Sequence, residues 1–336
     1  MRRPEPWVVT CIVVTAACSM ADVSYAIFAP FLPSFATARG ISQPTVGLIF
    51  ATPMVASFVC GPLGPAVTRR VGSRAAMCGS VLLMALSVLA FTPLDRLQDP
   101  GALAGSAISL RALQGLASAV FECAAGGVIM RAAPAEHVSR IVGWAEAARG
   151  LGAAAGPSLG GVLFEVGGWA LPFCAVGASL LVMLPVLAVL PGGSVAPVSR
   201  PASLVAVARI PEVFGGLLAI AVLMIAIGFL DPTLEPELRA PPLSLSHGAV
   251  GLVFSMLTLG YGLLSVVAGL LPSRGLRPHL QLACGTLAIA AGYLALGPAP
   301  FLPLPQTTAT ALGAMAAIGG GCGLSCTRRL SRTTDL

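Results

Sequence analysis

The chain has 336 residues, of which 56% are hydrophobic and only 10% are charged. Because soluble domains carry about 25% charged residues, this composition excludes a soluble protein. The formal net charge is +6, and all nineteen basic residues are arginines. The positions of the arginines along the chain therefore show where its positive charge lies.

Ten apolar runs approach the roughly 20 residues that cross a bilayer as a helix. In chain order they cover residues 7–28, 44–66, 75–91, 102–130, 138–164, 169–190, 213–230, 248–271, 280–296 and 308–324. The sequence therefore predicts an all-α polytopic membrane protein with about ten transmembrane helices.

The arginines alternate between the two sides of these ten spans. With a cytoplasmic N-terminus, fourteen arginines fall on the cytoplasmic side and three on the other, while Arg111 and Arg149 lie within spans. Positive residues concentrate in cytoplasmic loops, so we expect the N-terminus in the cytoplasm. The positive charge thus reports orientation and gives no reason to expect nucleic acid as a partner.

One segment, residues 191–211, has the composition of a linker, rich in proline, glycine and serine. It follows the sixth run, and transporters are commonly built from two similar halves. We therefore predict an N-terminal six-helix half at 1–190, a cytoplasmic linker at 191–211, an incomplete C-terminal half at 212–325 and a polar tail at 326–336.

The fourth and fifth runs contain the most informative residues. Polar and charged groups inside a span are costly and mark function by default, and the fourth run holds Arg111, Gln114 and Gly115. The fifth run has a glycine every fourth residue, which flattens one side of a helix so that another helix approaches closely. A proline on the same turn adds a kink. These fifth-run residues are Gly152, Gly156, Pro157, Gly160 and Gly161.

These two patterns resemble the helix-4 motif of the major facilitator superfamily and the helix-5 motif of its proton-coupled antiporters. Further stretches are similar to the vesicular amine transporters, particularly the vesicular polyamine transporter branch; they cover residues 30–33, 47–50, 228–234 and 251–254. The resemblance runs from about residue 15 to about residue 325. It implies a major facilitator fold and proton-coupled antiport of organic cations.

The chain departs from the superfamily in two places. After the second run, Arg69 and Arg70 stand where the family has an acid in its cytoplasmic gating loop, which here also contains Gly72 and Arg74. About ten of the usual twelve helices are present, so we expect a C-terminally truncated form. This leaves open a non-transporting isoform, one associated with a full-length copy, or a multidrug/proton antiporter.

Acids within or beside the spans are candidates for the substrate and proton pathway. Asp231 precedes Pro232 near the non-cytoplasmic end of the seventh run, where one carboxylate could bind either a proton or an ammonium. The alternative is a helix-end acid facing water. Glu235 and Glu237 lie farther out, and we expect them to be loop acids. Asp22, in the first run, is either a pathway acid or a structural acid bonded to neighbouring serines.

Two charge pairs complete the candidates. Arg111 and Glu122 are eleven residues apart, about three helical turns and about 16 Å, so we expect them on one face. Arg111 then either relays to the proton-carrying acid or snorkels to the interface. Glu146 and Arg149 are three residues apart, which allows mutual neutralisation; Glu146 alternatively lines the pathway.

The predicted pathway residues are Asp22, Arg111, Gln114, Glu122, Glu146 and Asp231. No catalytic triad, phosphate loop or metal-ligand spacing is visible in the sequence, so we expect no enzyme activity, no metal and no bound cofactor. The resemblance implies a transporter of small organic cations that uses protons as the driving force. The expected location is the membrane of a vesicle or another acidic organelle.

Overall fold

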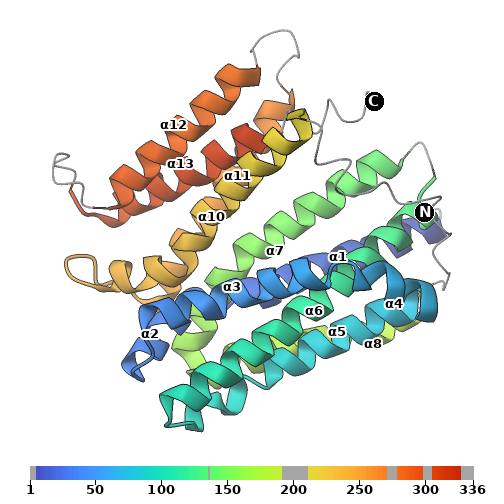
Figure 1. The fold of residues 1–336 in the computed structure, drawn as a ribbon, viewed down its shortest axis with the longest axis horizontal. Helices are drawn as coiled ribbons and strands as arrows, with labels where there is room; N and C mark the ends of the chain where they lie inside the picture. The colour runs from blue at the N-terminus through green and yellow to red at the C-terminus, as the bar shows by residue number, and fades with distance from the viewer. Residues whose placement is uncertain (1–4, 135–136, 191–210, 271–277, 298–304, 327–336) are drawn as a thin grey trace. The chain divides into compact units, whose positions relative to one another are not determined.

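The computed structural model describes residues 5–134, 137–190, 211–270, 278–297 and 305–326. Regular structure in these residues consists of helices (Figure 1). They are α1 (Pro6–Ala26), α2 (Leu32–Ala38), α3 (Gln43–Cys60), α4 (Leu63–Val71), α5 (Ser73–Leu89), the 3₁₀ helix η1 (Thr92–Arg96), α6 (Pro100–Ala132), α7 (Val138–Gly167), α8 (Ala170–Ala188), α10 (Pro211–Arg239), α11 (His247–Leu270), α12 (Pro278–Leu296) and α13 (Thr308–Cys326).

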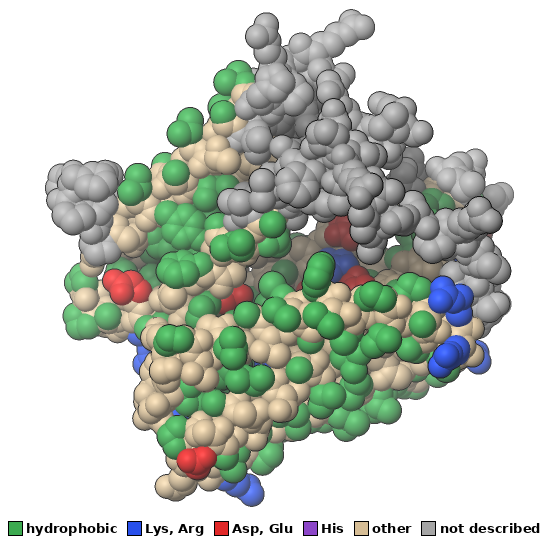
Figure 2. All heavy atoms as spheres, in the orientation of Figure 1, with side chains coloured by type: hydrophobic (Ala, Val, Ile, Leu, Met, Phe, Trp, Pro, Cys, Tyr) green, Lys and Arg blue, Asp and Glu red, His purple; other side chains and the backbone are tan. Residues whose placement is uncertain are grey.

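Each of the ten apolar runs overlaps one long helix, from α1 to α13. By length and hydropathy, six described segments are able to cross a membrane: Trp7–Ala26, Gln43–Cys60, Ser73–Arg96, Pro100–Ala132, Ala170–Ala188 and His247–Leu264. Figure 2 shows hydrophobic side chains spread over the visible face, with few charged ones between them. The predicted class, an all-α polytopic membrane protein, is confirmed.

Two element boundaries differ from the sequence prediction. The second run divides into α3 and α4 on either side of Gly61 and Pro62, where the N–H of Gly61 donates to the carbonyl of Phe58, three residues earlier, in a tighter turn. The seventh run continues beyond residue 230, and α10 ends only at Arg239. In α10 the hydroxyl of Thr233, next to Pro232, donates to the carbonyl of Phe229 at 2.5 Å, a bond that is typical of bent helices.

The described helices form two compact units. The first unit contains α1 to α8 together with residues Ser246–Gly251, and the second contains α10, the remainder of α11, α12 and α13. The division predicted at 191–211 stays a prediction, since residues 191–210 lie outside the described part, as does most of the polar tail.

Aromatic side chains form the core at one end of the first unit. Phe28, Phe91 and Phe173 meet with ring centroids 4.8–5.4 Å apart. Trp169 packs beside them, and its indole Nε1 donates to the carbonyl of Phe91 at 2.9 Å. Such rings are rigid and bury large areas, so this cluster connects the segments that follow α1 and α5 to the start of α8, next to the polar centre described below.

Candidate functional site

Arg111 lies well inside α6, and its side chain is fully buried. Its Nη1 donates to Oε1 of Gln114 at 2.8 Å and to the carbonyl of Tyr25 at 3.3 Å. The guanidinium carbon lies 4.2 Å from the ring centroid of Phe28 and 4.9 Å from that of Tyr25, within the range of cation–π attraction. The alternative in which Arg111 snorkels to the interface is wrong, because aromatic rings and carbonyl oxygens enclose its charge inside the protein.

Gln114 connects this arginine to α1. Its Nε2 donates to the carbonyl of Ser24 at 3.0 Å and to the Ser24 hydroxyl at 3.3 Å. Gly115 lies against α3 instead. A Cβ at this position would collide with the backbone of Pro53. Arg111 and Gln114 thus hold α6 against α1, while Gly115 allows α3 to approach.

Arg149, in α7, is the centre of a group of charged side chains from three helices. Its Nε lies 3.1 Å from Oδ2 of Asp22 in α1, and its Nη1 contacts Oε2 of Glu122 in α6. Glu146, one turn earlier in α7, is more distant, with its Oε1 4.0 Å from Nη1. We call Asp22, Glu122, Glu146 and Arg149 the charge cluster. With all four side chains ionised, three negative charges surround one positive charge.

The charge cluster differs from the pairs that the sequence predicts. Asp22 bonds to Arg149, where the sequence leaves open a bond to a neighbouring serine. Glu122 pairs with Arg149 as well, although its helix periodicity associates it with Arg111. Glu146, the partner that the sequence predicts for Arg149, makes the longest of the three carboxylate contacts of this arginine. Arg149 is therefore the candidate site residue that sequence reasoning missed, since its main partners lie on other helices.

A cavity of about 500 Å³ opens beside the charge cluster in the first unit. Two members of the charge cluster, Asp22 and Arg149, line it, as does Gln114 of the buried network. The rest of the wall combines hydroxyl groups with aromatic, thioether and other apolar side chains: Ala21, Ser24, Tyr25, Pro53, Met54, Ser57, Phe58, Met84, Gly115 and Ser118. This combination suits a small organic cation, because Asp22 and the aromatic faces attract positive charge while apolar groups contact hydrocarbon.

Glycines of α7 face the C-terminal part of α1, from Ser19 onward. A Cβ at Gly152 would collide with the carbonyl of Ser19, one at Gly156 would lie 2.7 Å from Cβ of Ala26, and one at Gly160 would collide with the carbonyl of Ile27. Gly152 follows Arg149 by one turn and Ser19 precedes Asp22 by one turn, so this close contact holds α1 and α7 together next to the ion pair.

The last residues of the fifth-run pattern meet the first turn of α11, which belongs to the same unit. A Cβ at Gly161 would collide with the carbonyl of His247, and one at Gly251 would collide with the carbonyl of Pro157. Glu165 also accepts a hydrogen bond from the backbone N–H of Gly248 at 2.8 Å. Pro157 lies inside α7 without ending the helix.

In the second unit, Asp231 is half-buried inside α10 and eight residues before the helix ends. The prediction that Glu235 is a loop acid is wrong: its side chain is fully buried in α10, and its Oε1 lies 3.5 Å from Nη1 of Arg239. Glu237 is exposed but also helical. Both differences arise because α10 continues past Pro232 to Arg239, whereas the sequence predicts that this helix ends near residue 230.

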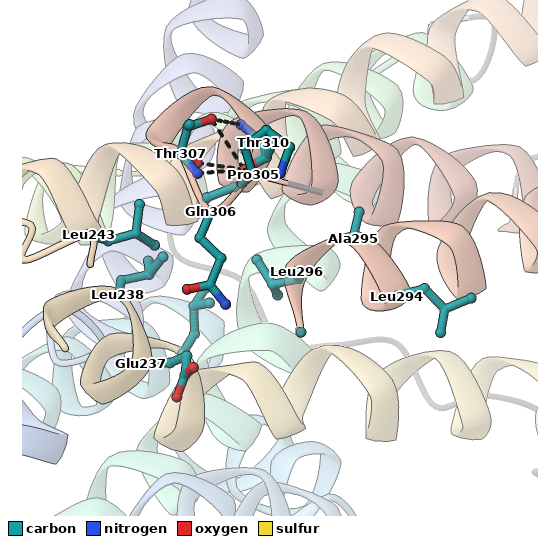
Figure 3. Close-up of a pocket in the computed structure, with 13 residues that line it drawn as sticks. Glu237, Leu238, Leu243, Leu294, Ala295, Leu296, Pro305, Gln306, Thr307 and Thr310 are labelled. Atoms are coloured by element: carbon teal, nitrogen blue, oxygen red, sulfur yellow. Dashed lines mark hydrogen bonds between the residues drawn. The ribbon is translucent and has the colours of Figure 1, made fainter. Parts of the chain in front are cut away.

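Glu237 borders a smaller cavity, of about 30 Å³, within the second unit. Figure 3 shows the side chain of Gln306 extended toward Glu237, and hydrogen bonds linking Thr307, Thr310 and Pro305 at the start of α13. A cavity of this size has room for about one or two water molecules. This cavity is therefore too small for an organic substrate.

The basic segment predicted as a gating loop is largely helical. Arg69 and Arg70 lie exposed in the last turn of α4, and Gly72 separates α4 from α5. Gly72 has φ +83°, a conformation that favours glycine. Arg74 donates to the carbonyl of Leu190 at 3.4 Å. The segment thus presents positive charge at one end of the first unit without an acid in its sequence.

Comparison with known proteins agrees with the fold. The family model described as Major Facilitator Superfamily matches residues 14–327. The MFS-type transporter SLC18B1 of Rattus norvegicus is 31% identical over 290 residues, covering 83% of this chain and 61% of the relative. The Mus musculus protein of the same name is 32% identical with the same coverage. The chain thus spans about three fifths of the length of these curated relatives.

Solved transporter structures share the fold at low sequence identity. The crystal structure of a bacterial homolog to the human lysosomal transporter Spinster, inward-facing and occupied, matches with a TM-score of 0.74 and 15% identity, covering 98% of this chain and 75% of that one. The D-xylose-proton symporter matches with a TM-score of 0.70 and 16% identity, covering 96% and 81%. The resemblances noted in the sequence, to the superfamily and to the vesicular polyamine transporter branch, are confirmed by the family model and the SLC18B1 relatives.

Proposed function

This chain belongs to the Major Facilitator Superfamily, and we propose that it exchanges protons for small organic cations by alternating access. The observation that carries this proposal is the cavity of about 500 Å³ with Asp22 and Arg149 in its wall and Glu122 bonded to the same arginine. In the superfamily's mechanism such a cavity opens to either side of the membrane in turn.

Carboxylates inside a membrane protein supply the chemistry of such an exchange. A carboxylate held away from bulk water is stabilised either by a proton or by a neighbouring cation. Asp22 and Glu122 each have one guanidinium contact and remain about one quarter to one third exposed, so protons and substrate can both reach them. Binding of one ligand at these acids then releases the other, which is the coupling step of an antiporter.

Organic cations with several amino groups are the substrate class that we propose. The charge cluster contains three carboxylates and one arginine, which favours a substrate with more than one positive charge. Tyr25 and Phe58 offer aromatic faces in the wall of the cavity that Asp22 and Arg149 also line. The resemblance to the vesicular polyamine transporter branch supports polyamines before monoamines.

Other predicted residues receive roles within this proposal. Asp231 would be the acid of the second unit that binds a proton or an ammonium. The glycines of α7 and Pro157 would allow α7 to change its angle during the transport cycle. The basic residues around Gly72 would form the cytoplasmic gating segment. The N-terminus would lie in the cytoplasm and the protein in an acidic organelle membrane.

The test is uptake of labelled spermidine, with serotonin alongside, into proteoliposomes that contain this chain and carry an acidic interior. We expect uptake that depends on the proton gradient. Glu122→Gln should reduce the initial rate about fivefold, because one partly exposed carboxylate–cation contact is worth up to about 1 kcal/mol. Asp22→Asn and Asp231→Asn should act in the same direction.

Glu237→Gln is the matched control for Glu122→Gln, since it makes the same chemical change at an exposed acid of α10. It should leave uptake within about twofold of the unmodified chain, as expected for a screened surface charge. Uptake of neither amine by a folded, inserted chain would contradict the proposal and favour a non-transporting form. Equal uptake of bulky aromatic cations and spermidine would favour a multidrug/proton antiporter.

A further inference from the structure

Arg149 occupies the position that a substrate cation would need. Its guanidinium lies between Asp22 and Glu122, donating Nε to one carboxylate and Nη1 to the other. The same side chain lines the cavity of about 500 Å³ together with Asp22. An ammonium entering this cavity therefore meets a carboxylate that already has a cationic partner belonging to the protein.

The arginine also has a third acid within reach. Glu146 precedes it by one turn in α7, and its side chain is 68% exposed, against 26% for Asp22 and 34% for Glu122. At 4.0 Å, Glu146 is at the limit of an ion pair in the present arrangement. An arginine side chain is long enough to turn toward a residue three positions earlier on its own helix, so the guanidinium has two alternative sets of partners.

We propose that Arg149 is an internal competitor for the cation site formed by Asp22 and Glu122, and that Glu146 receives its guanidinium when a substrate enters. This inference rests on the proposed function and adds a specificity-determining residue to it. A substrate binds only if its positive groups replace the guanidinium at both carboxylates. Singly charged cations cannot replace the guanidinium at both carboxylates and are excluded. When no substrate is bound, Arg149 partly neutralises the two acids.

If Arg149 is a competitor, its removal should change substrate affinity in the opposite direction to the removal of a structural residue. Removing an arginine that merely holds the helices together would weaken substrate binding, whereas removing a competitor strengthens it. In Arg149→Gln we expect spermidine to bind about tenfold more tightly, because each half-exposed ion pair that no longer has to be broken is worth a factor of a few. In Glu146→Gln we expect binding to weaken about threefold, because the displaced guanidinium loses its alternative partner.

The experiment is equilibrium binding of labelled spermidine to the full chain in lipid nanodiscs at neutral pH without a gradient. Arg96→Gln is the matched control, since it removes an exposed arginine of η1, and it should leave the dissociation constant unchanged. Arg149→Lys is a second variant in case Arg149→Gln does not fold. A lysine keeps the charge but lacks the fork that joins two carboxylates, so we expect intermediate tightening.

The outcomes separate this inference from the proposed function. Tighter binding in Arg149→Gln or Arg149→Lys, with weaker binding in Glu146→Gln, supports the competitor. Unchanged or weaker binding in folded Arg149 variants, while the unmodified chain binds spermidine, overturns the competitor and leaves the proposed function standing. Absence of binding to every folded variant and to the unmodified chain overturns both.

Discussion

Arg111 and Arg149 lie in consecutive long helices of the same unit, yet their surroundings differ in every respect that matters for exchange. Arg111 is fully buried, bonds to an amide and a carbonyl oxygen, and is flanked by the rings of Phe28 and Tyr25. Arg149 is 29% exposed and contacts carboxylates from three positions beside a cavity. The partners of Arg111 named here are neutral, whereas Arg149 contacts several acids among which a proton, a substrate or the arginine can be exchanged.

This difference suggests a division of labour in the first unit. Neutral acceptors and aromatic rings stabilise a buried guanidinium without offering a site for protons, so the Arg111 network is suited to holding α6 against α1. Carboxylates can be neutralised by protons or by foreign cations, so the charge cluster is suited to ligand exchange. A substitution at Arg111 should therefore mainly lower the stability of the fold, whereas one at Arg149 should mainly change substrate binding.

Arg111→Ala should have the largest effect on stability. It removes two charge-assisted hydrogen bonds and the cation–π contacts of a buried side chain, a loss of about 3–5 kcal/mol. The expected result is a large fall in the apparent melting temperature of the detergent-solubilised chain, measured by intrinsic fluorescence. A melting temperature close to that of the unmodified chain would show that the aromatic cage is dispensable.

Gly160→Ala should have the next largest effect on stability, because its Cβ would collide with the carbonyl of Ile27, directly after α1. Forcing a methyl group into such a contact typically costs about 1–3 kcal/mol. Gly150→Ala is the control on the same helix, since a Cβ there has no neighbour within 4 Å, and alanine should raise helix stability by up to about 1 kcal/mol. Equal melting temperatures for the two variants would refute the close packing of α1 on α7.

Arg149→Gln should have a smaller effect on stability than either change. Half-exposed ion pairs contribute about 1 kcal/mol or less, and removing the arginine leaves three acids to repel one another. We expect a fall in melting temperature well below that of Arg111→Ala, accompanied by the tighter spermidine binding described above. A fall as large as that of Arg111→Ala would mean that the two arginines are equally structural.

Salt dependence should give the smallest and most selective effect. A double-mutant cycle of Arg149→Gln with Asp22→Asn should yield a coupling energy below about 1 kcal/mol at low salt. Raising the ionic strength to about 1 M shortens the screening length to about 3 Å and should shrink that coupling. The destabilisation of Arg111→Ala should change little, because the partners of Arg111 named above are neutral. Equal salt sensitivity at Arg111 and Arg149 would contradict the proposed difference between neutral partners at Arg111 and charged partners at Arg149.

Patterns within single helices were the most predictable from the sequence. The spacing of Gly152, Gly156 and Gly160 predicts a flat helix side, and these glycines lie against α1. Arg111 and Gln114 are three residues apart, and they are bonded to each other. The end of α10 was not predictable in this way, since Pro232 signals a helix end but the helix continues. Glu235 was accordingly assigned to a loop.

Sequence alone determined that this chain is a helical membrane protein, which helices carry charge, and which superfamily its motifs resemble. Those properties depend on composition and on spacings of three or four residues, and both are local. Only the tertiary structure decided that Arg149 pairs with Asp22, 127 positions away along the chain, and with Glu122, 27 positions away. Which acid meets which arginine depends on how α1, α6 and α7 pack, because ionic contacts form across helices wherever close packing brings opposite charges together.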